Sequence, residues 1–166
     1  MPDLKGVFRV SSAKEIVRQK YPSLERTSLL WRKEIHPVLA AQNWKFLRGI
    51  CATYDLLQSR FKIPLASKCH LCGIAEENLE YVLFSCSFAA RAWTWISQIF
   101  GLTPKNNLVI SYKAATRRSQ MVRDLWLLAN LVIKSELWAL RNKVVFEHKK
   151  PNWNMFFKRV LKLVQD

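Results

Sequence analysis

The feature that most constrains the fold is a long helical pattern near residues 112–146, which contains the segment LWLLANLVI. Apolar side chains in this segment would cover nearly the whole circumference of a helix rather than one stripe. A helix that is apolar on all sides is buried, either in a protein core or in a membrane. The chain has no run of about 18 apolar residues, the length that crosses a bilayer. We therefore expect a buried helix at the centre of a globular domain.

Shorter helices are predicted to pack around this centre, because apolar residues recur at helical spacing and Pro, Gly, Ser or Thr marks the ends. The first predicted helix covers 13–20, with a capping box at Ser12 and Glu15 and a stop at Pro22, and the second covers 27–36 and ends before Pro37. Two more helices are predicted between Val38 and Phe61, with a break near Gly49 and with Thr53 as the cap of the second. A further helix covers 87–100 and is ended by Gly101, and the last one follows Pro151. Residues 102–111 are predicted to form a loop.

The composition agrees with an all-α fold. Half of the 166 residues are hydrophobic, which is enough for one sizeable core, so we expect a single domain over residues 1–166. Gly and Pro number only 4 and 6, too few for the many tight turns of a sandwich or barrel. The prediction is a helical domain around the long central helix, with a small cysteine-bearing segment resembling a zinc knuckle.

The charge of the chain indicates an anionic partner. Lys and Arg number 27 against 12 Asp and Glu, a formal net charge of +15. Such an excess is typical of proteins that bind nucleic acid, whereas the alternative is a basic surface that only promotes solubility. An anionic membrane surface ranks behind nucleic acid, and we do not expect a membrane partner. The candidate phosphate-binding residues are Lys113, Arg117, Arg118, Arg123, Lys149, Lys150, Lys158, Arg159 and Lys162. Tyr112 and Trp153 flank them as candidate platforms for base stacking.

Three of the four cysteines lie in one window, KCHLCGIAEENLEYVLFSC, residues 68–86. Cys69 and Cys72 form a Cys-x-x-Cys turn followed by a glycine, and Cys86 closes the window, so three thiols are available to one metal ion. A histidine four residues before Cys86 would complete a strong zinc signal, but Tyr81 stands there. A phenol is a poor zinc ligand at neutral pH because its ordinary pKa is about 10.

Two interpretations of this segment stay open. In the first, Zn²⁺ is bound and a carboxylate, an imidazole or water replaces the missing ligand. In the second, the cysteines are buried apolar groups and the segment holds its shape by packing, with Tyr81 filling the vacated volume. The residues considered as substitute ligands are Glu76, Glu77, Glu80, His70 and Cys51, and those expected to pack inward are Leu79, Val82, Leu83 and Phe84.

Four motifs in order resemble the zinc-binding domain that follows the reverse transcriptase in plant LINE-type (non-LTR) retrotransposon polyproteins. They are GVFRVSSAKEIV at 6–17, QNWKFLRGICATYDLLQSRFKIP at 42–64, KCHLCGIAEENLEYVLFSCSFAARAW at 68–93 and LWALRNKVVFEHKKPNW at 137–153. The resemblance implies a zinc-binding region over 6–100 and a basic helical region over 101–166. It also places the family's metal-ligand histidine on Tyr81. Neither a reverse-transcriptase block nor an RNase H acidic cluster is present, so a stand-alone chain is expected.

The leading functional hypothesis is a non-catalytic nucleic-acid-binding domain that prefers RNA over DNA and acts in the nucleus or cytoplasm. The alternative is a domesticated protein–protein adaptor or regulatory protein that has lost the metal site and that binds a partner or itself. We do not expect an enzyme. The three histidines belong to no recognisable catalytic motif, and there is no glycine-rich phosphate-binding loop.

Overall fold

A computed structural model describes residues 27–62 and 67–165, and it is mostly helical with no β-strand among those residues. The predicted helix at 13–20 lies outside the described residues. In chain order the elements are the short 3₁₀ turn η1 (Thr27–Leu29), helices α2 (Pro37–Arg48) and α3 (Tyr54–Phe61), the π-helical turn η2 (Tyr81–Ser85), and helices α4 (Ser87–Phe100), α5 (Leu108–Ala114), α6 (Gln120–Glu147) and α7 (Trp153–Gln165).

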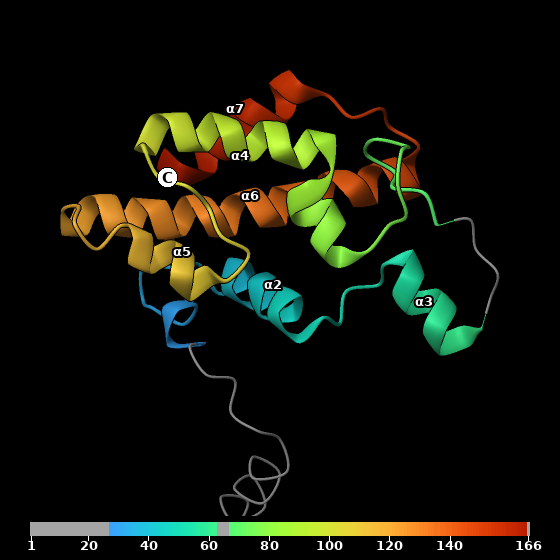
Figure 1. Ribbon diagram of the computed structural model, residues 1–166, viewed down its shortest axis with the longest axis horizontal. Helices are drawn as coiled ribbons and strands as arrows, with labels where there is room; N and C mark the ends of the chain where they lie inside the picture. The colour runs from blue at the N-terminus through green and yellow to red at the C-terminus, as the bar shows by residue number, and fades with distance from the viewer. Residues whose placement is uncertain (1–26, 63–66, 166) are drawn as a thin grey trace, which may run out of the picture.

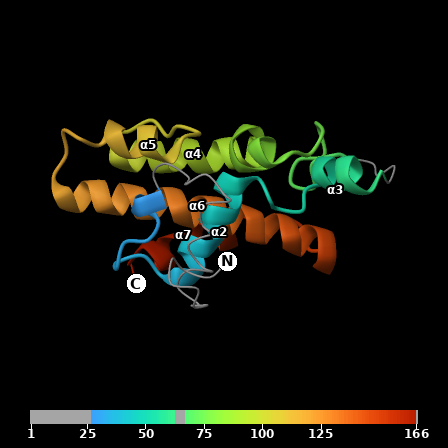
Figure 2. The same ribbon diagram turned by 90° about the horizontal axis from the view of Figure 1, so that it is seen from below.

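Helix α6 is the axis of the fold, as the apolar segment predicts. In Figure 1 it runs through the middle of the molecule, with α4 and α7 on one side and α5 and α2 on the other. Figure 2 shows α2 crossing α6, whereas α3 lies at the edge of the molecule. Trp126, Leu131, Ile133 and Leu137 of α6 have no exposed surface. None of the described helices is long and apolar enough to cross a membrane.

The predicted long helix at 112–146 is wrong at its start, because α5 and α6 are separate helices. Helix α5 begins inside the predicted loop, where the Asn107 side chain accepts hydrogen bonds from two backbone N–H groups. Five residues then turn the chain, and the Ser119 hydroxyl accepts a hydrogen bond from the Val122 N–H to cap α6. Side-chain caps of this kind compete with helix continuation and favour a break.

The prediction for 27–36 is also wrong, since only the turn η1 and further turns occur there. Pro37, expected to stop a helix, occupies the first turn of α2 instead. A proline suits this position because the first helical N–H groups have no partner within the helix. The His36 side chain caps the same end by accepting from the Val38 N–H at 3.2 Å.

The remaining helix ends confirm the sequence predictions. Gly49 ends α2 with φ +60°, a left-handed conformation that glycine adopts without strain. Thr53 occupies the N-cap position of α3, although its side chain makes no capping hydrogen bond. Gly101 ends α4 in the same left-handed conformation. Helix α7 buries Phe156 and Val160 against the core. These ends position the segment between α3 and α4, which contains the three clustered cysteines.

Candidate metal centre

The first two cysteines lie on a tight turn closed by backbone hydrogen bonds. The Gly73 N–H donates to the Cys69 carbonyl at 2.7 Å, and the Cys69 N–H donates to the Ala75 carbonyl at 2.8 Å. Gly73 has φ +69°, which a residue with a side chain rarely adopts. The sequence Cys-x-x-Cys-Gly therefore folds here as a knuckle, with both thiols on one side.

The third cysteine is supplied by the junction of η2 and α4. Cys86 ends the π-helical turn, with its N–H donating to the Tyr81 carbonyl at 2.8 Å, and it occupies the cap position of α4. The pKa of its thiol lies below the ordinary value, chiefly because of the Cys69 hydrogen bond, and despite burial. The N–H groups of Phe88 and Ala89 act in the same direction. The start of a helix favours a negative charge at this place.

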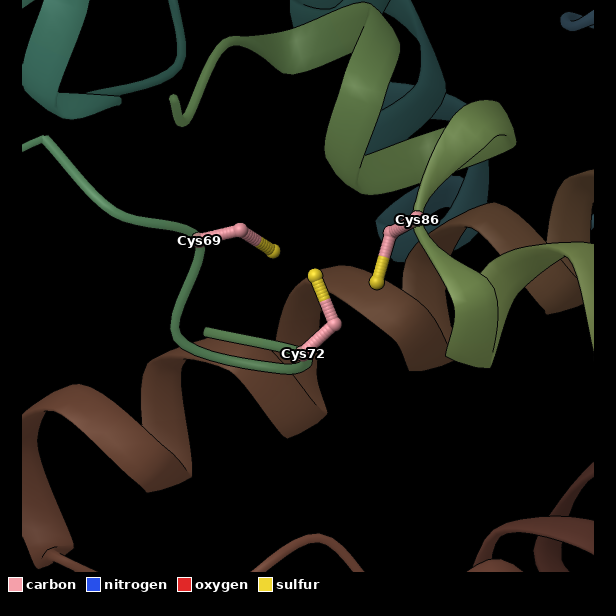
Figure 3. A group of neighbouring side chains, drawn as sticks. All are labelled: Cys69, Cys72 and Cys86. Atoms are coloured by element: carbon pink, nitrogen blue, oxygen red, sulfur yellow. The ribbon is translucent and has the colours of Figure 1, made fainter. Parts of the chain in front are cut away.

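The three sulfur atoms lie within 4.8 Å of one another and point toward a common centre (Figure 3). Cys69 and Cys86 are buried, Cys72 is half-buried, and none of them forms a disulfide. Tetrahedral zinc with Zn–S distances of about 2.3 Å needs sulfur atoms about 3.8 Å apart, so a small contraction would suffice. Three cysteines at these positions can coordinate a metal ion.

Tyr81 does not act as a fourth ligand in this arrangement. Its hydroxyl lies 3.4 Å from the Cys72 sulfur, within hydrogen-bond reach. That hydrogen bond, followed by burial and the neighbouring thiols, raises the pKa of Tyr81 to about 12. A protonated phenol at this place can donate a hydrogen bond to the Cys72 sulfur. The three thiols fit zinc as three protein ligands.

The other candidate ligands are engaged elsewhere. The His70 Nδ1 atom lies 2.9 Å from a Glu77 carboxylate oxygen, and His70 does not join the three sulfur atoms. Glu80 accepts a hydrogen bond from Asn106. Cys51 is buried and receives a contact of 3.8 Å from Gln42. Within the described residues, no further His, Cys, Asp or Glu joins the three clustered cysteines.

Sequence analysis missed the buried ion pair beside the knuckle. Glu77 has no exposed surface and contacts the Arg141 guanidinium with both oxygens, one of them 3.2 Å from Nε. Burial raises the pKa of Glu77, but the hydrogen bonds from Arg141 and His70 outweigh burial and hold it below its ordinary value. The sequence carries no signal for this pair, since Glu77 and Arg141 lie 64 residues apart. This pair fastens the cysteine segment to α6.

The expected inward packing of the segment is confirmed only in part. Val82 and Leu83 are buried, whereas Leu79 and Phe84 are half-buried. The Trp93 indole N–H donates to the Leu83 carbonyl at 2.7 Å, and its ring stacks on Phe84. Packing against α4 therefore helps to hold the turn η2.

The basic candidates at the junction of α5 and α6 form an exposed group. Lys113, Arg117 and Arg118, called the basic turn below, are exposed and form no ion pair with the described residues. Arg123 is half-buried and lies over the Tyr112 ring at 5.8 Å, so it is partly committed to packing. Tyr112 is half-buried as well, and its hydroxyl accepts from Arg32.

The C-terminal candidates do not form one patch. Lys149 and Lys150 follow the end of α6, whereas α7 turns back so that the C-terminus lies toward the other end of α6 (Figures 1 and 2). Lys149 pairs with Glu147, and Arg159 pairs with Glu136 at 2.6 Å. Lys158 and Lys162 of α7 are exposed.

The indole of Trp153 belongs to an aromatic cluster. Its ring packs against Phe88, Trp95 and Phe156, and the Arg91 guanidinium lies over it at 4.4 Å. It is half-buried by these contacts. Packing therefore accounts for this ring, and a stacking role for it has no support in the geometry.

Comparison with known proteins agrees with the geometry. A family model described as zinc-binding in reverse transcriptase matches residues 8–93, more than half of the chain, and this range includes all three clustered cysteines. A search of curated proteins and a search of solved structures found no match. The chain belongs to the family of zinc-binding domains associated with reverse transcriptases.

Proposed function

We propose that the chain is a non-catalytic nucleic-acid-binding domain, derived from a plant LINE-type retrotransposon polyprotein, that binds single-stranded RNA in preference to DNA in the nucleus or cytoplasm. The observation that carries the proposal is the net charge of +15 on a chain of this family. Lysine and arginine side chains that neutralise phosphates release counterions, which gives binding that is tight at low salt.

The basic turn is the favoured contact surface. Its three cations are exposed and free of carboxylate partners among the described residues, so no ion pair must break before a phosphate binds. Figure 1 places the junction of α5 and α6 at the same end of the molecule as the C-terminal end of α7, which carries the exposed Lys162. A backbone that follows this end would meet cations from both elements.

The cysteines have a structural role in this proposal. Zinc bound by Cys69, Cys72 and Cys86 would crosslink the knuckle to the start of α4 and fix the segment against α6. Among the described residues, the His70 ring pairs with the Glu77 carboxylate rather than with a serine or cysteine, and two of the three clustered thiols are buried. These features support binding rather than catalysis.

Fluorescence anisotropy with labelled single-stranded RNA, single-stranded DNA and duplex DNA at several salt concentrations tests the proposal. We expect Lys113→Gln/Arg117→Gln/Arg118→Gln to weaken binding and to reduce the slope of log K against log salt by about 0.7 for each lost contact to a single strand. The matched control removes the same charge from exposed sites elsewhere, with Lys33→Gln/Arg60→Gln/Lys68→Gln. Failure of the wild type to bind any of these nucleic acids at low salt would refute the proposal.

A groove between α2, α6 and α7 supports the alternative of self-association. It measures about 900 Å³ and includes Val38, Trp138 and Leu163, of which Val38 is 71% exposed. Apolar grooves of this size commonly receive apolar segments of a partner. Sedimentation equilibrium of wild type and Val38→Glu tests it: a dimer lost in the variant supports self-association, and a monomeric wild type at about 100 µM contradicts it.

A further inference from the structure

A second hollow lies on the molecule, next to the turn η2 and distinct from the basic turn. It measures about 290 Å³ and lies between η2, α2, α5 and α6. Its walls are mainly apolar and are formed by Phe46, Leu47, Leu79, Leu83 and Leu108. This volume is at the lower limit of small-molecule sites, so the hollow has room for one planar ring system but not for a helix or an oligonucleotide.

Lys134 brings a buried positive charge to this hollow from α6. Its side chain is only 5% exposed, and it forms no ion pair or hydrogen bond with the described residues. Its ammonium lies 5.5 Å from the centroid of the Phe84 ring. A charge that is largely removed from water gains from an acceptor that reaches it. Burial lowers the pKa of Lys134 to about 8, so the group still carries its proton at pH 7.

Two other polar groups of the hollow offer acceptors, and the Asn106 amide, which also lines it, donates to one of them. Glu80 is exposed and uses one carboxylate oxygen to accept from Asn106 at 2.5 Å, which leaves the second oxygen for another donor. The Asn43 amide group spends its N–H donors on the carbonyls of Leu39 and Leu131 and on Ser135, which leaves its oxygen as an acceptor. The hollow therefore combines two donors, the Lys134 ammonium and the Asn106 amide, with acceptors, set in apolar walls.

This combination does not fit a phosphate group. A phosphate needs several donors around its oxygens, whereas the walls are leucine and phenylalanine side chains and Glu80 would repel it. An unpaired nucleobase fits better, because its faces are apolar and its edge carries both donors and acceptors. Guanine offers the acceptors O6 and N7 together with the donating amino group N2, and lysine recognises O6 and N7.

We propose that this hollow is a recognition site for one unpaired guanine of a bound single strand, with the Lys134 ammonium donating to O6 and Glu80 accepting from the N1 and N2 edge. The proposal rests on the proposed nucleic-acid binding and adds base selectivity to it. Lys45 and Lys105 adjoin wall residues in sequence and are exposed, so phosphates on either side of the base would meet cations.

The test compares labelled nine-nucleotide RNAs in wild type and variants: one of uridines alone, and three with a central guanosine, adenosine or cytidine. We expect the guanosine strand to bind at least about fivefold more tightly than the uridine strand, since one good base contact gives discrimination of this order or more. In Lys134→Met, the guanosine strand and the uridine strand should bind with equal affinity. Lys143→Met, which removes a charge from the same helix, should keep the difference between the two strands.

Leu79→Trp, which fills the hollow from its wall, should abolish the same difference, and thermal unfolding of each variant checks that it folds. Wild type that binds both strands with equal affinity overturns the guanine site and leaves the proposed function intact. Wild type that binds neither strand at low salt refutes the proposed function, and the guanine site with it. NMR titration with isovalerate, a small apolar carboxylate, and with guanosine gives a further check. Shifts that isovalerate causes and guanosine does not, and that Lys134→Met removes, would assign the hollow to a carboxylate and would overturn the proposal.

Discussion

The ion pair between Glu77 and Arg141 offers the sharpest test of how the cysteine segment is held. Both side chains are buried, with exposed fractions of 0% and 2%, and Glu77 also accepts from His70 and the Tyr54 N–H. The Arg141 guanidinium in turn lies 5.4 Å and 5.1 Å from the rings of Tyr54 and Trp138. Replacing Arg141 with methionine keeps most of the side-chain volume but leaves the Glu77 carboxylate buried without its main partner.

The expected cost follows from that burial. Removing one partner of a buried ion pair destabilises a protein by about 3–5 kcal/mol, because an uncompensated charge remains. For a chain of 150–250 residues, each kcal/mol lowers the melting temperature by about 2–4 °C, so Arg141→Met should lose about 6–20 °C. Removing both charges with Glu77→Leu/Arg141→Met should cost less than Arg141→Met alone, since no charge is then stranded.

Thermal and urea unfolding of wild type, both single variants and the double variant would measure the coupling free energy. Arg91→Met is the control, because it removes an exposed arginine whose guanidinium lies over the Trp153 ring. A loss of less than 2 °C for Arg141→Met, or costs that simply add in the double variant, would refute the reasoning. The pKa of Glu77 is lower in the folded state than in the unfolded state. Its contribution to the free energy of unfolding is therefore present above its unfolded pKa of about 4.3 and is lost as the pH falls through its folded pKa.

Three further outcomes are expected. Tyr81→His should supply an imidazole beside the thiols, so the variant should retain more zinc than the wild type against a competing chelator, as measured by elemental analysis. Equal zinc retention in the two proteins would count against three-thiol coordination in the wild type. Gly49→Ala should cost about 1–2 kcal/mol in urea unfolding, because φ is +60° and no atom lies within 4 Å to add a clash. Because the folded pKa of Lys134 is about 8, unfolding stability should rise between pH 8 and 10.4 in wild type relative to Lys134→Met; parallel curves would contradict this.

The parts of the fold that the sequence predicts are those set by local signals. Gly49, Thr53 and Gly101 mark helix ends because their backbone or side-chain chemistry acts within a few residues. The errors fall where a local signal has two meanings. Pro37 can end one helix or begin the next, and the apolar residues on either side of the α5–α6 turn fit one helix as well as two. Packing against the rest of the chain decided these cases.

The candidate site was predictable only in its thiols. Cys69, Cys72 and Cys86 share a short window whose spacing already brings them together. Glu77 and Arg141 are 64 residues apart, so no periodicity relates them, and only the packing of the knuckle on α6 makes them neighbours. Lys134 follows the apolar segment of α6 directly, and nothing in its own segment indicates that a hollow lies beside it.

The arrangement around the knuckle also explains how the chain can keep its fold with Tyr81 in place of a metal ligand. In small zinc domains the metal supplies most of the folding free energy, since little else holds the chain. Here Val82 and Leu83 are buried in the main core, and the Glu77 ion pair fastens the same segment to α6 without a metal. We therefore expect a chelator to lower the melting temperature by less than Arg141→Met does. Complete unfolding on chelation at 25 °C would show that the metal, rather than packing, holds the segment.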